Sequence, residues 1–254
     1  MSPEHVLAEA AAWVWVPEEA RAVDTDEFLL IAYPEHFADP TVALRWASDR
    51  PADELIDLVL DAAAGLGRQS VSFFELSDAT RPADLEQRLV ERGAELTETL
   101  AVLALDLSDG VPGLDVPTDL DVRRVTTLED LRATDHIDVE VFGGTHADEA
   151  TLAAAAARLA DDHRLLALRA GSPVGTGGLV VADGTVRLWG AAVVPRARHT
   201  GVYRALLDRR LRAGVEAGAR MALVKGRVET SAPILLRAGF RQYGEVRAYR
   251  LAPA

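Results

Sequence analysis

Cysteine is absent from this sequence of 254 residues. Disulfide bonds, thiolate metal sites and a cysteine nucleophile are therefore excluded, and the chain suits a reducing compartment. The six histidines show no metal-ligand spacing such as H-E-x-x-H, so we expect no metal site. Neither G-x-S-x-G nor G-x-x-x-x-G-K-[ST] occurs, which argues against a hydrolase nucleophile elbow and against a P-loop.

Basic residues are outnumbered, with 27 Lys and Arg against 40 Asp and Glu and a net charge of -13. Nucleic acid is disfavoured as a partner, because phosphate-backbone binding needs a basic face. The apolar run Ala10–Val16 is too short to span a bilayer, and Glu4 and Glu9 stand where a signal peptide would carry positive charge. We expect a cytoplasmic protein without membrane contact, and the sequence leaves open whether it forms a homodimer.

Hydrophobic residues make up 49% of the chain, which is ample for a buried core. Strand-like and helix-like segments alternate and predict an α/β (α+β) fold. The segment Ser108–Asp119 is rich in Gly, Pro and Asp and predicts a linker between domains spanning residues 1–108 and 119–254. In the first domain, a helix is expected to begin at Pro51, with Asp49 as its N-cap.

The second domain contains the most distinctive succession of elements. Asp183-Gly184 predicts a hairpin that leads into the strand Val186–Val194. A loop of Pro, Arg, His, Thr and Gly follows, and then an amphipathic helix from Gly201 to about Gly218. The predicted inner face of this helix consists of Val202, Leu206, Leu211 and Val215.

The loop before this helix has the chemistry of an anion site. The first amides of a helix lack intrahelical partners, and the positive end of the helix dipole attracts negative charge. Arg196 and Arg198 add guanidinium groups suited to phosphate. We therefore predict that this loop binds a diphosphate.

Two segments, Leu89–Leu105 and Leu235–Leu251, share a helix end, a Gly in register, a polar turn and a final strand. Such units recur in any α/β protein, and a duplication of one fold is the alternative interpretation. In the first half, Asp53 and Glu54 stand where the second half has its arginines, and carboxylates there repel a diphosphate. The first half is thus expected to bind no coenzyme.

Residues 122–252 resemble the GNAT superfamily of acyl-CoA-dependent N-acetyltransferases. The family signature, V-x-P followed by R-G-x-G-[IV]-[GA] and a leucine pair, corresponds here to Val193-Val194-Pro195, Arg198-His199-Thr200-Gly201-Val202-Tyr203 and Leu206-Leu207. A downstream strand and the pair Gly239-Phe240 also match. The whole chain resembles a tandem GNAT arrangement, with a mostly antiparallel mixed sheet flanked by helices in each copy and a degenerate first copy.

The resemblance implies acetyl-CoA or another acyl-CoA as donor and a small-molecule amine as acceptor. The coenzyme-binding residues that it implies are Val193, Val194, Arg196, Arg198, His199, Thr200, Gly201, Val202 and Tyr203. A backbone N–H near Val193 or Val194 would polarise the thioester carbonyl, and the amine would attack it directly.

The chain departs from the family pattern at three positions. His199 replaces the first Gly of the loop, Tyr203 replaces a small residue, and Leu235 stands where the family often has a Tyr that protonates the leaving thiolate. Ser231, Tyr203 or water is left for that role. A bulky loop reduces close approach of the coenzyme.

Glu140, near the Gly pair that ends the first helix of the second half, is our first candidate for the general base. His136 and His146 are the alternatives, because their ordinary pKa suits proton transfer near neutral pH. A second hypothesis is a non-catalytic acyl-CoA sensor or scaffold. A third is a module that binds another phosphorylated nucleotide.

Overall fold

The computed structural model describes residues 1–160 and 163–252. The chain divides into two compact units that are not continuous in sequence. The N-terminal unit comprises residues 2–102, 226–233 and those from 243 onwards. The C-terminal unit comprises Met1 and residues 103–225 and 234–242.

The strand order in the N-terminal unit is β1 (Arg21–Asp24), β2 (Leu29–Ala32), β3 (Thr41–Leu44), β4 (Val71–Leu76) and β11 (Arg241–Leu251). Neighbouring strands are antiparallel except for β3 and β4, which are parallel. Three helices belong to this part of the chain: α1 (Pro3–Ala12), α2 (Ala52–Gly65) and α3 (Leu85–Glu91). The strand β5 (Glu95–Asp106) has residues in both units.

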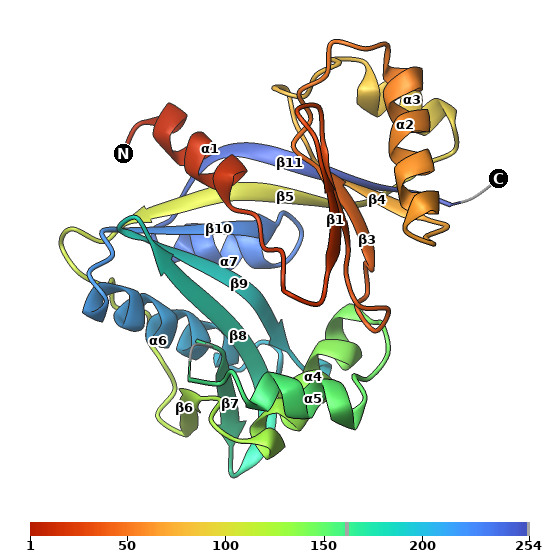
Figure 1. Ribbon diagram of the computed structural model, residues 1–254. Helices are drawn as coiled ribbons and strands as arrows, with labels where there is room; N and C mark the ends of the chain where they lie inside the picture. The colour runs from red at the N-terminus through yellow and green to blue at the C-terminus, as the bar shows by residue number, and fades with distance from the viewer. Residues whose placement is uncertain (161–162, 253–254) are drawn as a thin grey trace. The chain divides into compact units, whose positions relative to one another are not determined.

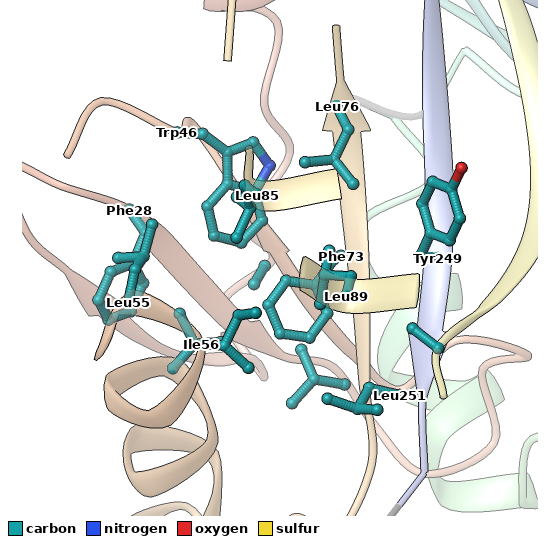
Figure 2. Packing of buried hydrophobic residues seen from close by; sticks show 14 of the residues in the cluster. Phe28, Trp46, Leu55, Ile56, Phe73, Leu76, Leu85, Leu89, Tyr249 and Leu251 are labelled. Carbon is teal, nitrogen blue, oxygen red and sulfur yellow. The ribbon is translucent and has the colours of Figure 1, made fainter. Parts of the chain in front are cut away.

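The core of the N-terminal unit lies between α2, α3 and the sheet. Figure 2 shows Phe28, Trp46 and Phe73 among leucines from the two helices. Tyr249 and Leu251 of β11 belong to the same cluster. The sequence predicts a second domain of residues 119–254, whereas the residues of β11 from Tyr243 onwards belong to the N-terminal unit.

The C-terminal unit contains the strands β10 (Met221–Arg227), β9 (Thr185–Val193), β8 (Ser172–Ala182), β7 (Leu165–Arg169) and β6 (Leu120–Arg124), in this spatial order. All neighbours are antiparallel except β9 and β10, which run parallel. The helices are α4 (Leu128–Phe142), α5 (Glu149–Ala156), α6 (Val202–Glu216) and α7 (Ser231–Arg237) (Figure 1). The first three residues of α7 belong to the N-terminal unit. A short 3-10 helix, Pro195–Ala197, precedes α6.

Local sequence accounts for the ends of several elements. Thr127 and Asp130 form a capping box at the start of α4. The β8–β9 hairpin turns at Asp183 and Gly184, which have φ angles of 50° and 74°, as a type I′ turn requires. The expected cap Asp49 does not occur: α2 begins after Pro51 without a side-chain cap, and the Asp49 side chain is exposed.

The inner face of α6 differs from the prediction at one position and gains an unexpected member. Val202, Leu206 and Leu211 are buried as expected, but Val215 is 36% exposed. Arg210 is only 1% exposed and is among the largest fully buried side chains of the described residues. The spacing of hydrophobic residues along the helix cannot predict that an arginine is buried.

The packing of α3 predicts a sharp contrast between two neighbouring residues. Leu89 is fully buried in the core of the N-terminal unit, and Val90 is 53% exposed. Leu89→Ala removes buried methyl groups and leaves a cavity, so we expect it to lower the free energy of unfolding by about 2–5 kcal/mol. Val90→Ala should change it by less than about 0.5 kcal/mol. Urea denaturation of both variants measures the difference, and equal effects would contradict the described packing.

Candidate functional site

The strands β9 and β10 pair only at their beginnings. Thr185, Val186 and Arg187 of β9 face Met221, Ala222 and Leu223 of β10, and the register ends there. β9 continues to Val193 and stays paired with β8 on its other edge. Within the C-terminal unit, the final two thirds of β9 therefore present an edge without a β10 partner, on which an extended ligand can pair.

A β-bulge lies in this open part of β9. The β8–β9 register shifts between Thr176 and Gly178, so that Gly190 and Ala191 lie opposite the single residue Gly177. Gly190 has a φ angle of 57°, which favours glycine. A bulge leaves one residue of the strand outside the ladder and re-aims its peptide groups. The bulge thus lies near the middle of the open edge.

The two residues predicted to polarise a thioester use their peptide groups differently. The Val194 N–H donates to the Val174 carbonyl at 3.1 Å, so it is occupied by the ladder. Antiparallel pairs alternate, and the N–H of Val193 consequently points away from β8. The Val193 carbonyl accepts a hydrogen bond from Arg198 Nε at 3.2 Å. Of these two amides, only that of Val193 faces the open edge.

The loop between β9 and α6 holds its amides unpaired. Ala197 N–H donates to Val194 O and Arg198 N–H to Pro195 O, forming the 3-10 turn. The backbone N–H groups of the next four residues make no hydrogen bond to any described residue; these are His199, Thr200, Gly201 and Val202. Such a row of amides at the start of a helix of 15 residues is suited to an anion.

Several contacts fix the conformation of this loop. Thr200 Oγ1 donates to Ala197 O at 2.7 Å, and Arg169 of β7 donates to both the hydroxyl and the carbonyl of Thr200 at 2.7 and 3.0 Å. Asp119 pairs with Arg169 at 2.9 Å. His199 has a φ angle of 62°. The histidine thus adopts the left-handed conformation that the glycine of the family signature adopts easily, at a cost of order 1 kcal/mol.

A pocket of about 330 Å³ lies beside the end of β9. Four residues of α4 line it, together with Pro173, Val194 and Arg196; those of α4 are Ala133, His136, Ile137 and Glu140. Arg196 Nη1 lies 3.4 Å from Glu140 Oε2, and its Nη2 donates to Pro173 O at 3.2 Å. Glu140, Val194 and Arg196, all predicted from the sequence, are therefore brought together.

The two alternative bases form a small polar cluster at this pocket. His146 Nδ1 lies 2.7 Å from Asp135 Oδ2, and the rings of His136 and His146 meet edge to face at 4.5 Å between centroids. His136 lines the pocket, and His146 contacts Asp135 and the His136 ring. In the part of the chain that the structure describes, no group of three or more metal-ligating side chains has the arrangement of a metal site.

The catalytic candidates do not all fall in one unit. Glu140 and Tyr203 belong to the C-terminal unit, and Ser231, the first residue of α7, belongs to the N-terminal unit. Any role of Ser231 stays a prediction. Leu235 is fully buried, in agreement with a packing role for that position.

Three polar residues of the site were not predicted from the sequence. Asp138 of α4 pairs with Arg164 at 2.8 Å, and burial raises the pKa of its carboxyl despite this cation. The Arg164 guanidinium lies over the Trp189 ring at 5.0 Å, and this ring covers Gly178. The third is Arg210, which lies against Gly177 and Tyr203. None of them belongs to a motif, and only their three-dimensional neighbours reveal them.

The corresponding junction of the N-terminal unit carries the opposite charge. Asp53 and Glu54 occupy the first turn of α2. Arg92 Nε donates to Asp53 Oδ1 at 2.9 Å. This helix start is thus covered by carboxylates, as the sequence comparison of the two halves indicated.

Solved structures with a similar fold are numerous. The chain superimposes on a GCN5-related N-acetyltransferase from Kribbella flavida with a TM-score of 0.65 at 17% identity, covering 100% of this chain and 96% of that one. A GCN5-related N-acetyltransferase from Sphaerobacter thermophilus gives a TM-score of 0.65 at 17% identity, covering 99% and 85%. A tandem GNAT protein from the clavulanic acid biosynthesis pathway gives 0.55 at 13% identity, covering 94% and 85%.

The chain has the GNAT fold. No family model matches the sequence. No curated protein matches it significantly either. The predicted fold class, a tandem GNAT-like mixed sheet flanked by helices, is confirmed. Among the described residues, no helix has the length and apolar character of a membrane span.

The geometry of the loop predicts a strict requirement for glycine at position 201. Gly201 has a φ angle of 87°, and a Cβ atom there would lie 2.5 Å from Pro117 Cγ. Gly218, at the other end of α6, has a φ angle of 85° with open space around it. We expect Gly218→Ala to cost about 1 kcal/mol and Gly201→Ala about 2–4 kcal/mol, because only the latter adds a clash to the backbone strain.

Thermal unfolding of the two variants measures this difference. Adding Pro117→Gly to Gly201→Ala should recover the steric part of the loss. If the double variant is no more stable than Gly201→Ala, the contact between Pro117 and Gly201 is not what limits this position.

Proposed function

We propose that this protein transfers an acetyl or other acyl group from acyl-CoA to the amine of a small molecule, and that the coenzyme binds to the C-terminal unit. The observation that carries the proposal is the combination of an open β9 edge with a row of unpaired amides at the start of α6. The first suits an extended pantetheine arm and the second suits a diphosphate.

In this proposal the amides from His199 to Tyr203 hold the diphosphate, and Arg198 stands beside it. The pantetheine arm pairs with the N–H of Val193, whose carbonyl is already held by Arg198. The amide of the bulge at Gly190 and Ala191 is the proposed donor to the thioester carbonyl, since the Val194 amide is occupied. A donor aimed at the oxygen stabilises the negative charge that develops during attack.

Glu140 is the proposed general base, acting directly or through water, with His136 in the same pocket. The ion pair with Arg196 holds this carboxylate in the free protein. A bound diphosphate competes for Arg196, and Glu140 is then released to accept a proton. Catalysis otherwise consists of holding the amine beside the thioester, which alone supplies a large part of the rate.

A non-catalytic acyl-CoA sensor is the second candidate function. The observation that favours it is the absence of the usual acid: Leu235 is buried in the core. The bulky side chains of His199 and Tyr203 also favour the sensor, because they hinder close approach of the coenzyme to the loop. This alternative requires coenzyme binding without release of thiol in the presence of any amine.

Titration calorimetry tests the coenzyme site. We expect acetyl-CoA to bind the wild-type protein, and Arg198→Gln to weaken binding about tenfold, because a charged hydrogen-bond donor near the diphosphate is lost. The matched control is Arg50→Gln, two residues before α2 in the N-terminal unit, which should leave binding unchanged.

Competition between ATP and acetyl-CoA distinguishes an acyl-CoA site from a module that binds nucleotides in general: ATP should not displace acetyl-CoA. No heat with acetyl-CoA at millimolar concentration would contradict the proposed function. Binding together with an amine panel that never yields free thiol would favour the sensor.

The proposed base is tested by Glu140→Gln. We expect turnover with a reactive amine to fall about 100-fold, the lower range for loss of a general base, with the acetyl-CoA dissociation constant nearly unchanged. Glu129→Gln in the first turn of the same helix is the control and should retain full turnover. Unchanged turnover of Glu140→Gln would remove this residue from the mechanism.

A further inference from the structure

The most unusual polar group of the C-terminal unit is the guanidinium of Arg210. Its side chain is 1% exposed, and its Nη2 atom is buried without a hydrogen-bond partner. Its Nε donates to Leu206 O at 3.2 Å. Among the described residues, no carboxylate lies within ion-pair distance of it. Removing a cation from water without a counter-ion is costly, so such a group is retained where it has a task.

The surroundings of Arg210 place it at the bulge of β9. The Arg210 Nη1 atom and the Ala191 Cα atom each lie 3.3 Å from the position that a Cβ of Gly177 would occupy. Glycine at position 177 is what leaves room for the guanidinium on the sheet. The cation therefore lies next to the peptide groups that we assign to the thioester carbonyl.

The second neighbour of Arg210 is Tyr203, two turns earlier on α6. The Arg210 Cζ atom lies 6.0 Å from the centre of the Tyr203 ring. Burial lowers the pKa of Arg210, while the charge and hydrogen bonding of the Tyr203 phenol act in the opposite direction. The interaction is reciprocal, because a cation that gains from a phenolate also stabilises that phenolate.

We propose that Tyr203 donates the proton to the thiolate of coenzyme A that leaves on acyl transfer, and that Arg210 is the positioning residue that holds Tyr203 and stabilises its anion. This inference rests on the proposed function and deepens it. The chain has Leu235 where the family often has its acid, and Tyr203 where the family has a small residue. The two departures compensate each other.

The neutral amine attacks the thioester carbon, a C–N bond forms and the C–S bond breaks. The base takes one proton from the nitrogen, and the sulfur takes the phenolic proton of Tyr203. The resulting tyrosinate lies beside Arg210 and regains a proton from the base through water. The products are the amide and free coenzyme A.

The first experiment needs no coenzyme. The sequence has four tyrosines, and burial raises the pKa of Tyr33 and of Tyr249 to about 12. Ultraviolet absorbance follows tyrosinate formation with pH. We expect the first transition of the wild-type protein to be lost in Tyr203→Phe and to be kept in the control Tyr243→Phe.

Substitution of the arginine should move the same transition. Arg210→Met removes the buried charge and fills the space, and should raise the midpoint by about one pH unit or more, the usual size for an adjacent opposite charge. Arg210→Lys keeps a charge and should restore part of the shift. Arg209→Met, at the exposed neighbouring position, should leave the midpoint unchanged. A midpoint that does not respond to Arg210→Met overturns the proposal.

The second experiment measures the reaction. In Tyr203→Phe, we expect the acetyl-CoA dissociation constant to stay within about twofold, because the ring is retained, and turnover to fall about 100-fold. The loss should be much smaller with acetyl thiophenol as donor, since an aromatic thiolate leaves without a proton.

Each remaining result has a definite meaning. Unchanged turnover of Tyr203→Phe overturns the proposal, and so does an equal loss with both donors. Tighter binding and faster turnover of Tyr203→Gly would mean that the ring obstructs the pantetheine arm, which also overturns it. If the wild-type protein binds no acetyl-CoA, the proposed function and the proposed role of Tyr203 as the acid both fail. The absorbance titration then still reports whether Tyr203 and Arg210 are coupled.

Discussion

The close packing of α6 on β8 is the contact on which the C-terminal site depends. Gly175 and Gly177 present no side chain to the helix, and Val202, Leu206 and Arg210 occupy the space that their Cβ atoms would fill. Further along, Gly214 of the helix accommodates Val186. Glycines on both surfaces let the helix lie close to the sheet. The start of α6 is thereby held at the end of β9, where its amides meet the open strand edge.

Contacts from β7 and from within α6 hold the loop that carries the two bulky residues His199 and Tyr203. His199 takes up the left-handed conformation, and Arg169 together with Thr200 stabilises the turn around it. The Tyr203 side chain extends toward Arg210. Local strain is thus offset by contacts from β7 and from the helix itself.

Much of the fold could be predicted from the sequence because its signals are local. The Asp183-Gly184 turn and the loop before α6 depend on a few neighbouring residues, and the structure has them where the pattern indicated. The segment 108–119, expected to join two domains, lies within the C-terminal unit. The parts that escaped prediction depend on distant partners. A buried arginine such as Arg210 resembles any surface arginine until Gly177 is placed beside it, and Asp138 is recognised only through Arg164.

The last strand of the chain has a bearing on how the protein is made. β11 pairs with β4, and Tyr249 and Leu251 complete the core around Phe73. On the ribosome, the first hundred residues emerge long before these two side chains exist. The core of the N-terminal unit therefore stays partly uncovered until the residues from Tyr243 to Leu251 have been synthesised. Its closing contacts span most of the sequence, which makes them the slowest kind to form.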